Sequence, residues 1–156
     1  MFLPVFDKVS DNRKKYRRKV NKVDLIILEG WCVGSKPIDP NYLKKNINDL
    51  EKIEDSNLLW RTAYNKALVE YQKVFKKFSY FVFIKIPNWK FVIDWKYKQE
   101  LGLRSSNSNN HLKKKLYRFI QFYEKLSKWM FLTSPSDCNV LVTLDKKQTA
   151  KKITYK

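Results

Sequence analysis

The sequence has few of the residues that build metal centres and disulfide frameworks. Its 156 residues include three glycines, two cysteines and one histidine. Two cysteines cannot form a disulfide scaffold or a four-cysteine zinc site, and the single His111 excludes a centre with several histidines. Three glycines and five prolines also exclude collagen-like and low-complexity classes. We therefore expect Cys32 and Cys138 to be free thiols in a cytoplasmic protein.

Long hydrophobic runs are also absent. The most apolar stretch, residues 80–84, is far too short to cross a membrane. The apolar start of the chain ends at Asp7 and Lys8, whereas a signal peptide needs a longer apolar region and a small-residue cleavage site. We therefore expect no membrane segment and no membrane partner.

Negative charge is scarce as well. The 15 acidic residues stand against 33 lysines and arginines, which gives a net charge of +18. Hydrophobic residues at 44% and aromatic residues at 15% are too frequent for a disordered chain, and the length fits one domain. The charge leaves three classes open: a nucleic-acid-binding protein, an enzyme for anionic substrates, and a soluble domain from a lysine-rich proteome.

The apolar pattern predicts an α/β fold in which strands alternate with long helices. Three continuous apolar runs, at residues 24–28, 80–86 and 139–144, are typical of strands covered on both faces in a parallel sheet. Apolar residues three and four positions apart predict helices at 58–78 and 112–130, the second with Asn109 or Asn110 as its cap. A shorter helix is expected at 89–101, after Pro87 and before Gly102. Residues 2–23, 104–110 and 146–156 are expected to be irregular, the last as a frayed basic tail.

Glu29 is the first residue along the chain for which this pattern suggests a chemical role. Ligands of a parallel sheet bind beyond the carboxyl ends of its strands, and Glu29 directly follows the first predicted strand. A carboxylate there can hold a magnesium ion or its water shell in a phosphoryl-transfer site. A solvated strand-end carboxylate is the plainer interpretation, and position alone favours it.

Five motifs follow one another along nearly the whole chain. They are LPVFDKVSDNR at 3–13, EGWCVG at 29–34, NDLEKIED at 48–55, DWKYKQE at 94–100 and RFIQFYEKLSKWM at 118–130. This series resembles the D-glycerate 3-kinase family, P-loop kinases related to phosphoribulokinase and uridine kinase. The family's motifs are LPRFDKS-x-DDR, EGW-x-x-G, NALE-x-x-ED, RWR-x-x-QE and RF-x-QHYERLTRWM. The resemblance extends over residues 3–145.

The resemblance implies transfer of the γ-phosphoryl group of ATP to a small hydroxy acid such as D-glycerate, with ATP and magnesium as cofactors. At the matching positions it implies the following roles: catalysis by Glu29 and Asp7, magnesium at Glu29 directly or through water, acceptor binding by Lys8, Asp11 and Arg13, and nucleotide binding by Lys96, Lys98 and Arg104. The plainer interpretation of these residues is a solvated charged loop and an exposed helix face.

Two parts of the family pattern are missing. Three glycines cannot supply a GxxxxGK[ST] loop, and no Asp-Asp-Phe-Tyr segment occurs. Residues 1–145 therefore resemble the carboxyl-terminal part of such a kinase, and 146–156 form a basic tail. In these kinases the strand before the loop separates the strand that carries Glu29 from the two later strands. We therefore expect an incomplete three-layer fold with a gap in its sheet, marginally stable unless a separate N-terminal half completes it.

Departures within the motifs leave alternatives to catalysis. Asp94 and Lys96 stand where the family has the two arginines of Arg-Trp-Arg, and a lid arginine neutralises the transferred phosphoryl group. We therefore expect this chain alone to be inactive. One alternative is a non-enzymatic basic protein that binds nucleic acid or another polyanion. Another is a remnant of a kinase gene without function.

Overall fold

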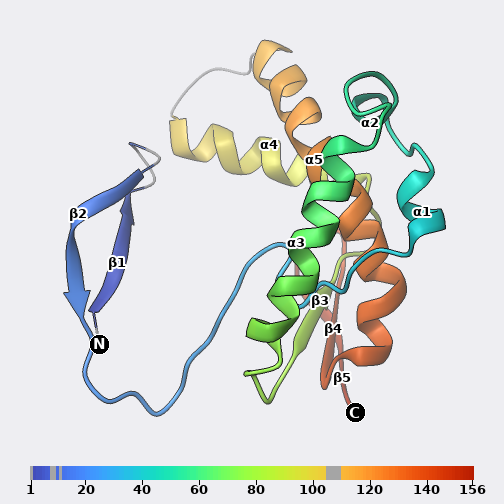
Figure 1. Cartoon of the computed structure of the whole chain (residues 1–156). Helices are drawn as coiled ribbons and strands as arrows, with labels where there is room; N and C mark the ends of the chain where they lie inside the picture. Colours follow the sequence, from blue (N-terminus) through green and yellow to red (C-terminus); the bar gives the residue numbers. More distant parts are fainter. Residues whose placement is uncertain (1, 8–9, 11, 105–109) are drawn as a thin grey trace. The chain divides into compact units, whose positions relative to one another are not determined.

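The computed structural model describes residues 2–7, 10, 12–104 and 110–156, with the backbone alone at 102–104, 110 and 111. The chain divides into two compact units, Met1–Gly30 and Trp31–Lys156, and each is described by itself (Figure 1). Among the described residues, no helix combines the length and the apolar character that crossing a bilayer requires.

The first unit contains a β-hairpin that the sequence did not predict. Strands β1 (Phe2–Asp7) and β2 (Asn12–Lys19) pair antiparallel, with an irregularity between Pro4 and Phe6. The prediction of an irregular segment over 2–23 was wrong for these residues. Every residue of β2 is exposed and most are basic, so the strand has no buried face and no apolar alternation that a pattern could reveal.

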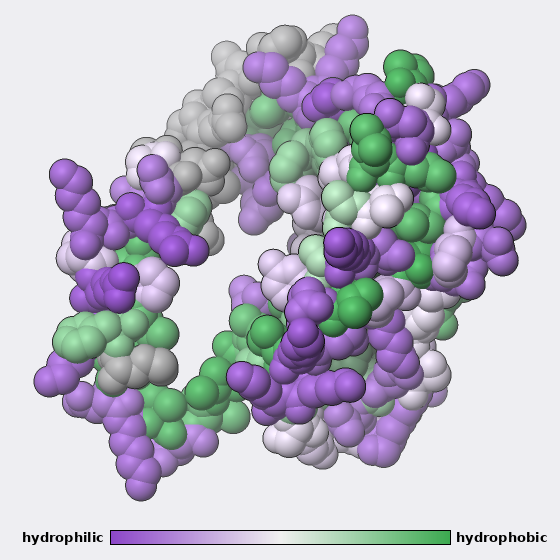
Figure 2. Space-filling view, viewed as in Figure 1, coloured by the Kyte–Doolittle hydropathy of each residue, from purple (hydrophilic) through white to green (hydrophobic). Residues whose placement is uncertain are grey.

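The prediction of a buried strand at 24–28 was also wrong. This stretch belongs to no strand, and Leu25, Ile26 and Ile27 are 75%, 62% and 79% exposed. Figure 2 shows apolar atoms along this extended segment. An apolar run becomes a buried strand only where a neighbouring strand accepts its backbone hydrogen bonds, and none does so among the described residues.

The second unit has the mixed α/β composition that the sequence predicted. Its elements are α1 (Pro40–Lys44), α2 (Asp49–Ile53), α3 (Leu59–Phe75), β3 (Val82–Lys85), α4 (Phe91–Arg104), α5 (Asn110–Asp137), β4 (Val140–Leu144) and β5 (Ala150–Tyr155). The three long helices lie where they were predicted, and the apolar stripe predicted for α5 includes its buried residues Leu116, Ile120 and Met130. The stripe predicted for α3 is wrong: Ala63, Ala67, Tyr71 and Val74 are exposed, and the helix buries Arg61 and Leu68 instead. The short helices α1 and α2 were not predicted, and α5 continues past the expected end at 130 and through Pro135.

The sheet of this unit has the order β3-β4-β5. The parallel pairing of β3 with β4 is confirmed, with Phe83 opposite Leu141. The prediction of a frayed tail at 146–156 was wrong, because β5 pairs antiparallel with β4. Asp145 forms the turn between them, since its carboxylate accepts the backbone N–H groups of Lys147 and Thr149. Residues 153–155 are Ile, Thr and Tyr, which suit a strand.

The two faces of this sheet differ in cover. Phe83 is 6% exposed and packs with Met130 and Cys138 in the core. Residues directly opposite one another share a face, so the other face carries Val82, Ile84, Val140, Val142, Ile153 and Tyr155. Four of these six are at least half exposed: Val82, Ile84, Ile153 and Tyr155. We call these six residues the open face; the expectation of strands covered on both sides was wrong for it.

Adjacent residues of β3 should respond differently to truncation. We expect Phe83→Ala to lower the free energy of unfolding by about 3–5 kcal/mol, because it leaves a cavity against α5. Ile84→Ala should cost about 1 kcal/mol or less, since this side chain is already solvated. Urea denaturation of both variants measures the difference. Equal losses would contradict the assignment of the two faces.

Candidate functional site

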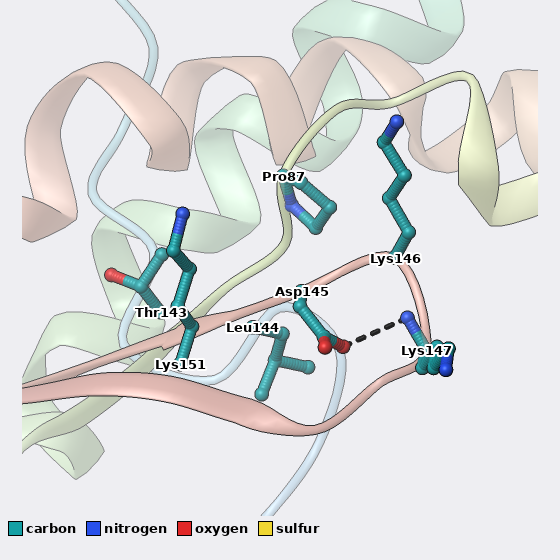
Figure 3. Close-up of a pocket in the computed structure, with 7 residues that line it drawn as sticks. All are labelled: Pro87, Thr143, Leu144, Asp145, Lys146, Lys147 and Lys151. Carbon is teal, nitrogen blue, oxygen red and sulfur yellow. Dashed lines mark hydrogen bonds between the residues drawn. The ribbon is translucent and has the colours of Figure 1, made fainter.

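A pocket of about 560 Å³ lies at the carboxyl ends of the parallel strands β3 and β4. It is lined by Pro87, Thr143, Leu144, Asp145, Lys146, Lys147 and Lys151 (Figure 3). Pro87 follows β3, the next five residues come from the end of β4 and its turn, and Lys151 comes from β5. Open α/β sheets bind ligands at this edge. We therefore take this pocket as the candidate site.

The pocket is positively charged. Three lysines line it, and its single carboxylate is committed to the turn: Asp145 Oδ1 lies 2.8 Å from the N of Lys147 and 2.9 Å from the N of Thr149. Hydrogen bonds from these backbone groups, that of Thr149 first, hold the pKa of Asp145 below its usual value. The three lysines therefore give the pocket a positive charge that attracts anions.

Sequence reasoning missed the pocket lysines. They fell in the stretch treated as a frayed tail, so they were given no role. The available signal was the β-forming run at 153–155, which lies a few residues after a polar turn at 145–149.

Glu29 does not occupy the end of a sheet strand. It ends the extended segment of the first unit and is exposed. Among the described residues, no three His, Cys, Asp or Glu side chains come together as a metal site. A kinase magnesium ion takes one or two carboxylates and completes its shell with substrate phosphates and water. Glu29 is one such carboxylate, so its predicted magnesium role stays a prediction.

The predicted acceptor residues lie in the hairpin. Asp7 ends β1 opposite Asn12, and Arg13 of β2 lies opposite Phe6, so Asp7 and Arg13 are on opposite faces of the two-stranded ribbon. Asp7 Oδ2 is 4.0 Å from Nζ of Lys14. Lys8 and Asp11 lie outside the described residues.

The predicted nucleotide-binding residues lie on α4. Lys96 Nζ is 3.0 Å from Oε1 of Glu100 and 3.1 Å from Oε1 of Gln99. These contacts give Gln99 and Glu100, which sequence analysis left without a role, a local structural one. Lys98 is exposed, and the side chain of Arg104 lies outside the described residues.

The motifs at 48–55 and 118–130 supply three of the four residues of a buried charge cluster, and Arg61 is the fourth. The charge cluster consists of Glu51, Asp55, Arg61 and Lys125, each at most 3% exposed. Arg61 Nε is 2.7 Å from Oδ2 of Asp55, and its Nη1 is 3.3 Å from Oε2 of Glu51. Lys125 Nζ lies 3.2 Å from that same Glu51 oxygen. Two carboxylates and two cations thus neutralise one another inside the protein.

Polar contacts from the same motifs fasten α2 to α5. Asn48 caps α2 by accepting the N–H of Glu51, and its amide donates to the carbonyl of Gln121 and to Oε2 of Glu124. Gln121 Oε1 in turn accepts the N–H of Leu50 at 2.9 Å. These motif residues therefore position helices.

The EGWCVG motif also has a structural part. Trp31 stacks on Tyr123, with ring centroids 4.7 Å apart, and donates its indole N–H to Oγ of Ser127 at 2.8 Å. Gly34 has φ +81°, and a Cβ there would meet the Phe81 ring at 2.7 Å, so this turn requires glycine. Cys32 and Cys138 are free thiols, and burial raises the pKa of Cys32 to about 11.

Comparison with known proteins places the chain near kinases. No family model matches it. The uncharacterized kinase mug58 of Schizosaccharomyces pombe is 29% identical over 100 residues, which are 63% of this chain and 35% of that protein. The solved D-glycerate 3-kinase of Cryptococcus neoformans matches all of this chain and 60% of its own, with a TM-score of 0.71 and 18% identity. The match confirms the resemblance to D-glycerate 3-kinase at the level of the fold.

Removing Arg61 should be costly. We expect Arg61→Met to lower the free energy of unfolding by about 3–5 kcal/mol, because Glu51 and Asp55 remain buried with too little positive charge. Arg118→Met is the matched control: its Nη2 lies 2.6 Å from Oε2 of Glu54, but both side chains are about half exposed. That change should cost about 1 kcal/mol or less. Similar losses in urea denaturation would show that the charge cluster is not a stabilising centre.

The charge cluster also predicts acid sensitivity. Burial alone raises the pKa of Asp55, but hydrogen bonds from the Arg61 side chain and from the backbone N–H groups of Trp60 and Arg61 outweigh it and hold the pKa below 3.8. The stability from this carboxylate is therefore complete above the unfolded-state pKa and is lost as pH falls through the folded-state pKa. Wild type should lose more stability than Asp55→Asn between about pH 5 and pH 2. Parallel denaturation profiles of the two proteins would contradict this.

Proposed function

We propose that this chain is the carboxyl-terminal part of a kinase of the D-glycerate 3-kinase type, which transfers the γ-phosphoryl group of ATP to a small hydroxy acid. One observation carries the proposal: the fold likeness to a D-glycerate 3-kinase extends over the whole chain at a TM-score of 0.71. The five ordered motifs also support it. Two of them contribute to the charge cluster that positions α2, α3 and α5, so they have a structural role in this fold.

The residues of this chain do not complete a phosphoryl-transfer site alone. No GxxxxGK[ST] loop occurs in the 156 residues, so the backbone amides that cradle the phosphates are not supplied. Asp94 repels a phosphoryl group at a position where the family has an arginine. Lys96, at the other arginine position, contacts Glu100. We therefore propose that the chain by itself is inactive.

Three features of the structure fit completion by further polypeptide. β3 has β4 as its one sheet neighbour among the described residues, the open face is solvated, and the apolar run at 24–28 has no strand partner. A three-layer fold covers both faces of its sheet. A strand beside β3 that leads into a P-loop would give the free edge its hydrogen bonds, and a helix behind it would cover the open face.

The pocket then supplies an anion-binding corner of the completed site. Lys146, Lys147 and Lys151 would attract a carboxylate or phosphate group of a ligand. The added P-loop would bind the phosphates of ATP together with magnesium, and when bound the ion neutralises the charge of the phosphates. Glu29 would contact the water shell of the ion. Asp7 and Arg13, with Lys8 and Asp11, would contribute acceptor contacts from the hairpin.

Calorimetry with ATP and magnesium tests the proposal directly. We expect no binding to the purified chain at millimolar ATP, with or without D-glycerate, and no transfer of phosphate. A chimera that adds the P-loop part of the Cryptococcus enzyme should bind ATP, and Glu29→Ala should weaken that binding. Tight ATP binding by the chain alone that Glu29→Ala abolishes would contradict the proposal. Weak binding that only Lys146→Gln/Lys147→Gln/Lys151→Gln removes would instead report charge attraction to the pocket.

A further inference from the structure

The two faces of the β1–β2 hairpin differ in chemistry. The register pairs Phe2 with Lys19, Pro4 with Arg17 and Phe6 with Arg13, and directly opposed residues share a face. One face therefore carries these six residues: Phe2, Pro4, Phe6, Arg13, Arg17 and Lys19. We call it the cationic face. Leu3 is paired with Arg18, and Asp7 with Asn12, on the other face.

The cationic face has no acidic residue among the described residues of the hairpin. The one described carboxylate of the two strands, Asp7, lies on the other face, 4.0 Å from Lys14 Nζ. Arg13, Arg17 and Lys19 are all exposed. Their three charges are therefore available to an external anion, in contrast to those of the charge cluster in the second unit.

Two phenyl rings lie among these cations. Phe2 is 62% exposed and Phe6 is 56% exposed. A surface that served solubility alone would not need them. Proteins that bind single-stranded nucleic acid combine such parts, because bases stack on aromatic rings while arginine and lysine contact the backbone. Arg17 and Lys19 are two residues apart on one strand, so about 7 Å separates their Cα atoms, and their long side chains can contact separate phosphates.

We propose that the cationic face binds single-stranded nucleic acid, with bases on Phe2 and Phe6 and phosphates at Arg13, Arg17 and Lys19. A duplex fits less well because its bases are stacked inside and cannot cover the rings. This activity does not depend on the proposed kinase function, although Arg13 is part of both proposals. It also gives the polyanion-binding alternative a defined surface.

Fluorescence anisotropy of a fluorescein-labelled oligouridine, titrated with the full chain at several salt concentrations, tests this surface. Arg17→Gln/Lys19→Gln should reduce the slope of log Kd against log salt by about 1.4, because each single-strand phosphate contact contributes about 0.7. Lys14→Gln/Arg18→Gln is the matched control: it removes the same charge from the other face and should leave the slope unchanged. Circular dichroism verifies that each variant is folded.

The phenyl rings are tested separately from the charges. Phe6→Ala should weaken binding by roughly 5- to 100-fold, and Phe6→Tyr should restore it, since either ring can stack on a base. Equal slope changes in the two double variants would overturn the proposal, as would tighter binding to a duplex of the same length. Displacement of the oligouridine by phosphatidylserine vesicles with the same dependence on Phe6 would also overturn it, and would assign the face to an anionic membrane surface.

Discussion

The guanidinium of Arg61 is completely buried, so each of its five N–H groups must find an acceptor inside the protein. Nε donates to Asp55, Nη1 to the Leu43 carbonyl and to Glu51, and Nη2 to the carbonyls of Glu51 and Asp55. Lys125 is satisfied similarly, by Glu51 and by the carbonyls of Tyr42 and Lys45. The desolvation of these charges is offset only if every partner is in place. That requirement fixes the mutual positions of α1, α2, α3 and α5.

The helical side of the second unit is thus specified by polar contacts, while the sheet side is specified incompletely. Phe83 and its neighbours build a small apolar core against α5, but the six residues of the open face have no cover among the described residues of the unit. Val82, Ile84 and Ile153 are apolar although polar residues on a solvated strand face cost little. Apolar side chains of this kind are typical of a strand face that packs against other elements.

The sequence predicted the elements whose burial follows from local periodicity and missed those that depend on pairing. The stripe of α5 predicted its buried face, and β3 and β4 were predicted by their apolar runs. Periodicity placed α3 correctly but chose the wrong face, because the face that it buries includes the charged Arg61. β2 was not predicted because its sequence, NRKKYRRK, has no buried face and so no apolar pattern. β5 was not predicted because its many lysines suggested a disordered tail. The prediction at 24–28 was wrong in the opposite sense, because it named a strand where none forms. The composition there suits a strand, but strand pairing also needs a neighbour. Likewise the motifs located the family, yet spacing could not separate residues of a pocket from Glu51, Asp55 and Arg61, which hold helices.

The free-energy balance of the run at 24–28 explains why hydrophobicity alone does not bury it. Fully burying its four apolar side chains would contribute about 6–12 kcal/mol at about 1.5–3 kcal/mol each. Ordering the five residues costs about 5–10 kcal/mol in backbone entropy. The two quantities nearly cancel, so burial becomes favourable only when a neighbouring strand supplies backbone hydrogen bonds and helices cover both faces. The same balance applies to the free edge of β3. The unpaired run and the free edge therefore have the same requirement, a neighbouring strand that none of the other described residues supplies.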